Sequence, residues 1–111
     1  MTTKQRVSSY TEESLQFLDG LIGEPETLGG LLRAIRKGED LTQKDFSQTL
    51  KISVQNLSDI EHSRRPVSPR KAAGFAKKLG YSKERFIELA LQDLIFREGI
   101  KGFIVNLQKA S

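Results

Sequence analysis

The 111-residue sequence contains no cysteine and no tryptophan, and His62 is its single histidine. The lack of cysteine excludes disulfides and metal sites built on thiolates. The N-terminus lacks the apolar stretch of a signal peptide, and no apolar run approaches the length needed to span a membrane. We therefore expect a cytoplasmic protein without membrane association. Its length favours one domain with one modest core.

Side chains that could carry catalysis or hold a metal are equally sparse. His62 has no surrounding arrangement of nucleophile and base, so we expect it to lie on the surface or to contact the backbone. Gly29 and Gly30 lack the Lys-Ser/Thr that follows a phosphate-binding loop. There is no cluster of metal ligands. A catalytic function is therefore the weakest hypothesis, and we expect no catalytic residue, no metal and no cofactor.

Charge is distributed unevenly along the chain, although the total is only +4. Residues 1–27 hold two basic and five acidic groups, a net −3, whereas residues 28–80 hold eleven basic and five acidic groups, a net +6. Residues 81–111 hold five basic and four acidic groups, a net +1. A basic segment attracts phosphate whatever the base sequence, so residues 28–80 favour binding to nucleic acid. An ordinary solvated surface is the alternative.

Residues 42–65, TQKDFSQTLKISVQNLSDIEHSRR, contain two short helical patterns joined by a tight turn. Thr42 is placed to cap the first helix and Ser53 the second. Phe46 and Leu50 lie four residues apart and share one helix face. This is the arrangement of a helix-turn-helix, whose second helix enters the major groove of DNA.

The residues at specific places resemble the lambda/434-repressor type of helix-turn-helix, the XRE family. The matching pairs are Thr42-Gln43, Phe46-Ser47, Ile52-Ser53, Leu57-Ser58 and Ile60-Glu61. Three residues depart from the family pattern: Ser47 replaces the usual Ala, Lys51 the usual Gly of the turn, and Ser63 the Gly that often follows the second helix. Lys51 and Ser63 are expected in left-handed conformations, costing roughly 1 kcal/mol, unless the turns follow a different path.

The resemblance implies that one set of residues contacts the bases of double-stranded DNA and another set contacts its phosphates. The residues expected to contact base edges are Val54, Gln55, Asp59 and, as a further candidate, Ser58. The residues expected to contact phosphates are Gln43, Ser53, Asn56, Arg64 and Arg65. Two alternatives stay open at this stage: Gln55 as a solvated helix residue, and Arg65 as a partner of Glu61 four residues earlier.

Further helical patterns flank the motif. They are expected from Thr11 to Asp19, from Leu28 to Lys37, from Ser68 as a cap to Leu79, and from Ser82 as a cap to Arg97. The predicted fold class is all-α: a five-helix lambda-repressor-like domain over residues 28–100, a short N-terminal helical arm over residues 1–27, and a C-terminal β-strand within residues 101–111.

The strand prediction rests on a change of period in KGFIVNLQ, residues 101–108. Phe103, Val105 and Leu107 alternate with their neighbours, as in a strand. One strand cannot satisfy its own backbone groups, so we expect it to pair with the same strand of a second copy in a homodimer that reads a palindromic operator. The alternative is a tail that packs on its own domain.

The segment SRRPVSPRKAAGFAKKLGYSKERFIELALQDLIFREGIK resembles HigA-type antitoxins of bacterial toxin–antitoxin modules. That resemblance implies a repressor of its own operon with a ribonuclease toxin as partner. The acidic N-terminal arm suits a basic toxin, with Leu15 and Leu18 as the expected partner-binding anchors, although the arm could equally be a solvated flank or fold onto its own domain. A stand-alone phage-type regulator without a toxin is the second hypothesis.

Overall fold

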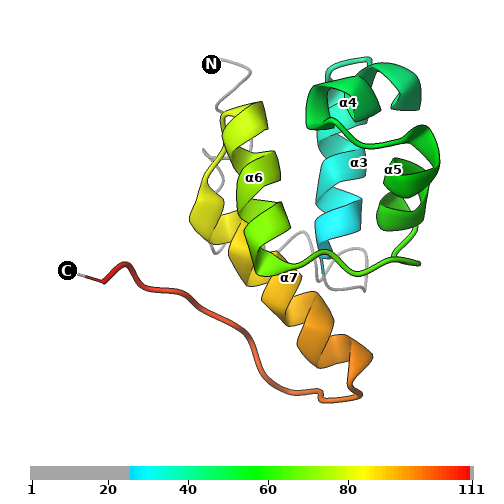
Figure 1. Ribbon diagram of the computed structural model, residues 1–111. Helices are drawn as coiled ribbons and strands as arrows, with labels where there is room; N and C mark the ends of the chain where they lie inside the picture. The colour runs from blue at the N-terminus through cyan, green and yellow to red at the C-terminus, as the bar shows by residue number, and fades with distance from the viewer. Residues whose placement is uncertain (1–25, 111) are drawn as a thin grey trace.

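The computed structural model describes residues 26–110, which form five α-helices (Figure 1). The helices are α3 (Leu28–Gly38), α4 (Gln43–Leu50), α5 (Val54–Glu61), α6 (Pro69–Leu79) and α7 (Lys83–Arg97). The helix expected from Thr11 to Asp19, with Leu15 and Leu18, lies outside the described residues. Within the described part, no helix is long and apolar enough to cross a membrane.

Each of these helices begins at a serine or threonine whose side-chain oxygen accepts a hydrogen bond from a backbone N–H three residues later. The capping residues are Thr27, Thr42, Ser53, Ser68 and Ser82. Such a bond satisfies one of the N–H groups that a helix start leaves free, and it typically contributes about 1 kcal/mol. The starts predicted at Thr42, Ser53, Ser68 and Ser82 are confirmed.

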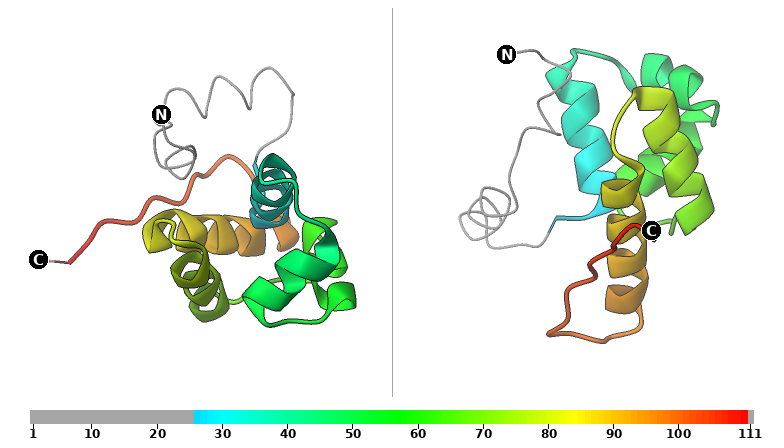
Figure 2. Two further views of the ribbon diagram at one scale, coloured as in Figure 1. Left: turned by 90° about the horizontal axis from the view of Figure 1, so that it is seen from above. Right: turned by 90° about the vertical axis from the view of Figure 1, so that its left-hand side faces the viewer.

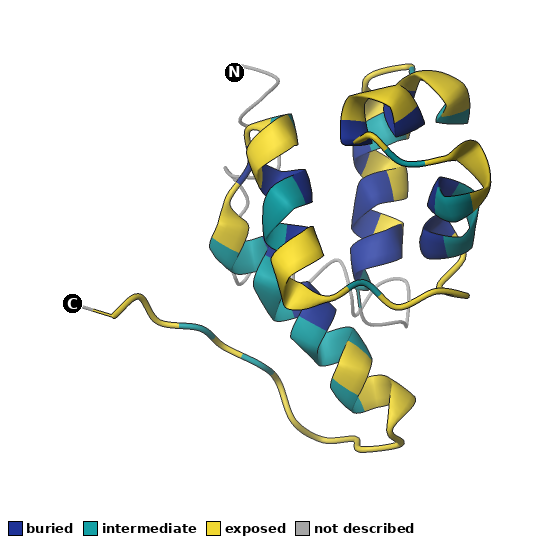
Figure 3. Ribbon diagram, viewed as in Figure 1, coloured by how far each residue is buried: buried dark blue, intermediate teal, exposed yellow. Residues whose placement is uncertain are grey.

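The core draws buried apolar side chains from all five helices (Figure 3). Its largest fully buried members are Phe46, Phe75, Phe86, Leu28, Leu32, Leu50, Leu57 and Ile60. Helix α6 packs mainly on α7, while α3 contacts both α5 and α7. Helix α4 also packs on α6, so both α3 and α4 connect the helix-turn-helix to the α6–α7 pair.

The contact between α3 and α5 depends on a glycine near the start of α3. A Cβ atom on Gly29 would collide with the carbonyl oxygen of Ile60 and would lie 3.3 Å from the carbonyl carbon of Glu61. Only a residue without a side chain permits the two backbones to come this close. The sequence pattern gave no sign of this role for Gly29.

The predicted C-terminal strand is wrong: residues 26–110 contain no strand. Residues 101–110 instead run as an extended tail back along α7 (Figures 1 and 2), and their backbone groups bond to side chains of that helix. The alternation is present only in part: Val105 and Leu107 are half-buried, but Phe103, predicted on the same face, is exposed like Ile104. A period of two thus indicated an extended chain correctly, but the partner of that chain is a helix.

Candidate nucleic-acid interface

Two left-handed residues define the turns on either side of α5. Lys51, between α4 and α5, has φ 61° and ψ 45°, and Ser63, after α5, has φ 59°. Both positions confirm the left-handed conformation expected where these residues replace glycine. Ser47 replaces the usual alanine at a position that is only 2% exposed, and its hydroxyl donates to the Lys44 carbonyl at 2.9 Å. The replacement of alanine by Ser47 therefore introduces no buried hydroxyl without a hydrogen-bond partner.

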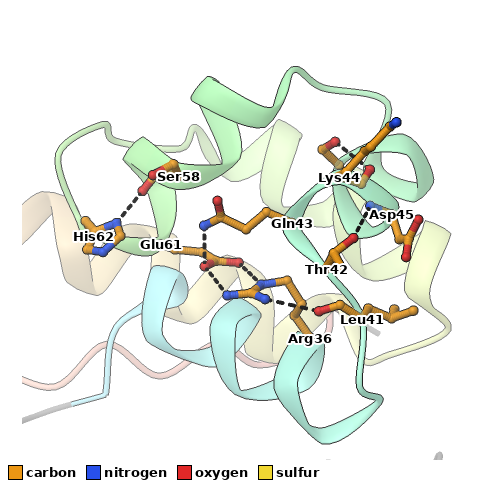
Figure 4. Close-up of polar contacts among 10 residues, drawn as sticks. Arg36, Leu41, Thr42, Gln43, Lys44, Asp45, Ser58, Glu61 and His62 are labelled. Carbon is orange, nitrogen blue, oxygen red and sulfur yellow. Dashed lines mark hydrogen bonds and ion pairs between the residues drawn. The ribbon is translucent and has the colours of Figure 1, made fainter.

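A buried ion pair connects the three helices α3, α4 and α5 (Figure 4). Arg36 donates from Nε to Glu61 Oε2 at 2.8 Å and from Nη2 to Glu61 Oε1 at 3.0 Å. Gln43, at the start of α4, donates to the same Oε1 at 3.1 Å, and Arg36 also donates to the Leu41 carbonyl at 3.1 Å. The Glu61 side chain is 0% exposed and that of Arg36 is 13% exposed.

The geometry of this pair is bidentate, which is the strongest arrangement of guanidinium and carboxylate. The hydrogen bonds to Glu61 raise the pKa of Arg36 above its already high usual value, so the guanidinium stays charged. Because Glu61 closes α5 while Gln43 opens α4, the network fixes the angle between the two helices of the motif. Glu61 is therefore engaged by Arg36 and not by Arg65, which rules out the proposed Arg65–Glu61 pair.

The outer face of α5 carries the residues predicted to contact base edges. Val54 is 43% exposed at the start of the helix, and Gln55 beside it is exposed. Gln55 Nε2 donates to Asp59 Oδ1 at 3.0 Å, and Arg64 pairs with the same carboxylate oxygen at 3.1 Å from Nη2. Asp59 thus holds Gln55 and Arg64 together at one exposed surface, while Ser58 is half-buried.

The residues predicted to contact phosphates occupy different environments. The Gln43 amide is bound to Glu61, and the Ser53 hydroxyl oxygen accepts from the Asn56 N–H at 3.0 Å. Asn56 Oδ1 is buried and has no hydrogen-bond partner among the described residues. Arg65 is exposed. Ser53 retains a hydroxyl proton to donate, so its cap role and a phosphate contact are compatible.

Side chains also organise the loop that follows α5. Arg97, in the last turn of α7, donates from Nη2 to the Ser63 carbonyl at 2.8 Å, a contact that the sequence did not reveal. His62 Nδ1 lies 2.8 Å from the Ser58 carbonyl, so the ring contacts the backbone as expected. The basic Arg64–Arg65 segment is therefore tied to α5 and to α7.

Comparison with known proteins identifies this region. Residues 32–86 match the helix-turn-helix family. The searches of curated proteins and of solved structures returned no significant match. The family match and the geometry of α4 and α5 agree that this region is a helix-turn-helix of the XRE type, which is found in DNA-binding transcription regulators.

Proposed function

We propose that the protein is a sequence-specific transcriptional repressor that inserts α5 into the major groove of an operator. The observation that carries this proposal is the Gln55–Asp59–Arg64 cluster at the exposed face of α5, next to the exposed side chain of Val54. The net +6 of residues 28–80 favours the approach of this domain to phosphate.

Gln55 suits direct readout of adenine. Its bond to Asp59 uses one of two amide protons, which leaves the second proton and the carbonyl oxygen for N7 and the N6 amino group of adenine. Val54 offers a methyl surface to a thymine. Arg64, whose side chain is 55% exposed, is positioned for a phosphate because Asp59 balances only part of its hydrogen-bonding capacity.

Two variants test this assignment against each other. Gln55→Ala should weaken binding to the operator by about 1–3 kcal/mol and relax selection at one base position, without changing binding to random DNA. Arg64→Ala should weaken binding to both DNAs and lower the salt slope by about one unit. Unchanged base preference in Gln55→Ala would contradict the assignment of Gln55, and an operator-only loss in Arg64→Ala would make Arg64 a base reader.

The repressor is further proposed to act as a homodimer on a palindrome, with half-sites roughly 34 Å apart or a multiple of that spacing. In support, large exposed apolar side chains gather in one stretch of the chain at the end of α7; we call Leu94, Phe96, Ile100, Phe103 and Ile104 the α7-end patch. A second copy would cover this patch. Of the predicted dimer residues, Phe103 belongs to the patch, while Val105 and Leu107 face α7. Sedimentation at micromolar concentration tests the dimer.

An antitoxin role is the finer part of the proposal. It is supported by the resemblance of the segment after the motif to HigA-type antitoxins and by the net −3 of residues 1–27, which suits a basic ribonuclease toxin. We expect a small basic protein to be encoded beside this gene and to bind this protein through Leu15 and Leu18. Only chains that retain residues 1–20 should neutralise it. Neutralisation by the truncated chain would show that the arm is a structural element, whereas the lack of a toxin gene beside this one would favour a stand-alone regulator.

A further inference from the structure

Three side chains of α7 form a row that binds the C-terminal tail. Glu84, Glu88 and Gln92 are spaced four residues apart and therefore share one face of the helix; we call them the α7 ladder. Gln92 donates from Nε2 to the Phe103 carbonyl at 3.0 Å and accepts from the Val105 N–H at 2.7 Å.

The ladder continues toward the start of α7. Glu88 accepts from the Leu107 N–H at 3.0 Å, and Glu84 pairs with Lys109 at 3.6 Å. The helix therefore contacts every second residue of the tail, mostly through the tail's backbone. Because Val105 and Leu107 are the side chains that turn inward, the α7 ladder is a site for an extended peptide with apolar residues at alternate positions.

The connection between α7 and the tail contains two points of unusual backbone freedom. Gly99 has φ 80° and Gly102 has φ 89°, conformations that glycine adopts without strain. Rotation at these glycines can redirect the tail without disturbing α7. Residues 98–102, when extended, span up to roughly 17 Å, enough to reach a copy that meets the end of the same helix.

Apolar exposure concentrates at the same connection. Just after Gly102, Phe103 is 68% and Ile104 74% exposed, whereas Val105 and Leu107 further along the tail are half-buried. Leu94, Phe96 and Ile100 are 46–49% exposed on the last turns of α7 and just beyond. Two copies that meet at their α7-end patches would bring each tail next to the partner's helix.

We propose that the homodimer is formed by exchange of the tails, so that the tail of each copy occupies the α7 ladder of the other. The exchange retains every hydrogen bond of the tail, because the α7 ladder of the second copy carries the same three side chains, and a two-fold axis fills both ladders. The gain is burial of Phe103 and Ile104 where the two chains cross. This inference rests on the proposed homodimer and specifies how it is built.

Introduced cysteines can test the exchange cleanly, because the chain has none of its own. Glu84→Cys and Lys109→Cys remove the outermost and most exposed contact of the ladder, and Glu84→Cys also removes the acceptor of the Ser82 hydroxyl at the start of α7. The two single variants are unfolded, mixed, refolded together and treated with a short bismaleimide. Random pairing makes about half of the dimers mixed, and tail exchange predicts that these mixed dimers become covalent. A mixture of Glu84→Cys with Lys44→Cys, which lies on α4, controls for random encounters.

The double variant Glu84→Cys/Lys109→Cys shows whether the cross-link forms within one chain or between two chains. Sedimentation of the uncross-linked protein gives the oligomeric state for comparison. In a protein that sediments as a dimer, the double variant could cross-link only within single chains while the mixed single variants stay separate. That result would show that the tail is not exchanged, and the proposed homodimer would stand. If the protein sediments as a monomer at micromolar concentration, the homodimer fails, and the exchange fails with it.

Discussion

The buried pair of Arg36 and Glu61 should contribute more to stability than any other ion pair described in the domain. We consider the substitution Glu61→Ala. It removes the acceptor of two bonds from Arg36 and of one from Gln43, and it leaves the guanidinium with the Leu41 carbonyl as its remaining bond partner. The arginine cannot escape readily into water, because its side chain is only 13% exposed.

Breaking a buried pair by removing one partner typically costs 3–5 kcal/mol, and each hydrogen bond between charged groups contributes about 1.5–3 kcal/mol. The residual exposure of Arg36 places this case at the lower end, so we expect a loss of about 3 kcal/mol. For a domain of this size, that loss lowers the melting temperature by roughly 12–24 °C.

Urea unfolding followed by circular dichroism measures the loss, with Lys109→Ala as the matched control. The Lys109–Glu84 pair is longer, at 3.6 Å, and its side chains are 83% and 40% exposed, so its removal should cost far less than loss of the buried pair. The double variant Arg36→Met/Glu61→Leu should recover most of the stability, because apolar side chains of similar volume replace a buried pair at little cost. A loss below about 1 kcal/mol in Glu61→Ala would refute the reasoning.

Three further predictions concern stability. Gly29→Ala should lower the free energy of unfolding by at least about 1–3 kcal/mol, because the new methyl group meets the Ile60 carbonyl. Gly74→Ala, with open space around it, should stabilise α6 by roughly 0.5–1 kcal/mol. Equal effects of the two variants in thermal unfolding would contradict this prediction. Lys51→Gly should raise the free energy of unfolding by up to about 1 kcal/mol by relieving its left-handed conformation, and a lower melting temperature would oppose that view. Burial raises the pKa of Asp93 above 3.8, although its bond from the Leu28 N–H opposes the shift. Because the folded state then holds this proton more tightly than the unfolded state, stability falls as pH rises from 3.8 through the raised pKa, and Asp93→Asn should remove that part of the pH dependence in acid titrations of stability.

The sequence was most informative where local chemistry decides structure. The caps at Thr42, Ser53, Ser68 and Ser82 follow from hydrogen bonds within a few residues. The left-handed turns at Lys51 and Ser63 were expected from the resemblance, because the family pattern has glycine there and sterics disfavour this conformation at other residues. These features, together with the resemblance at the motif, located both helices of the helix-turn-helix.

Contacts between distant residues were beyond the pattern. In the sequence, Gly29 looks like an ordinary helix residue, and only the position of α5 shows why it must be glycine. Glu61 likewise looks like a surface acid, because its partner Arg36 lies 25 residues away in the chain. The alternation of residues 103–107 indicated an extended backbone but carried no information about its partner. Side chains four apart on α7 supply the hydrogen-bond partners that a neighbouring strand would otherwise supply.

Selection of duplexes from a random pool by the wild-type protein tests the central claim most directly, namely that α5 reads base sequence in the major groove. The account predicts enrichment of one palindrome whose half-sites are protected in the major groove, and loss of preference at one base pair in each half-site when Gln55→Ala repeats the selection. Salt-sensitive binding without any enriched sequence, or an enriched sequence that Gln55→Ala selects unchanged, would contradict it.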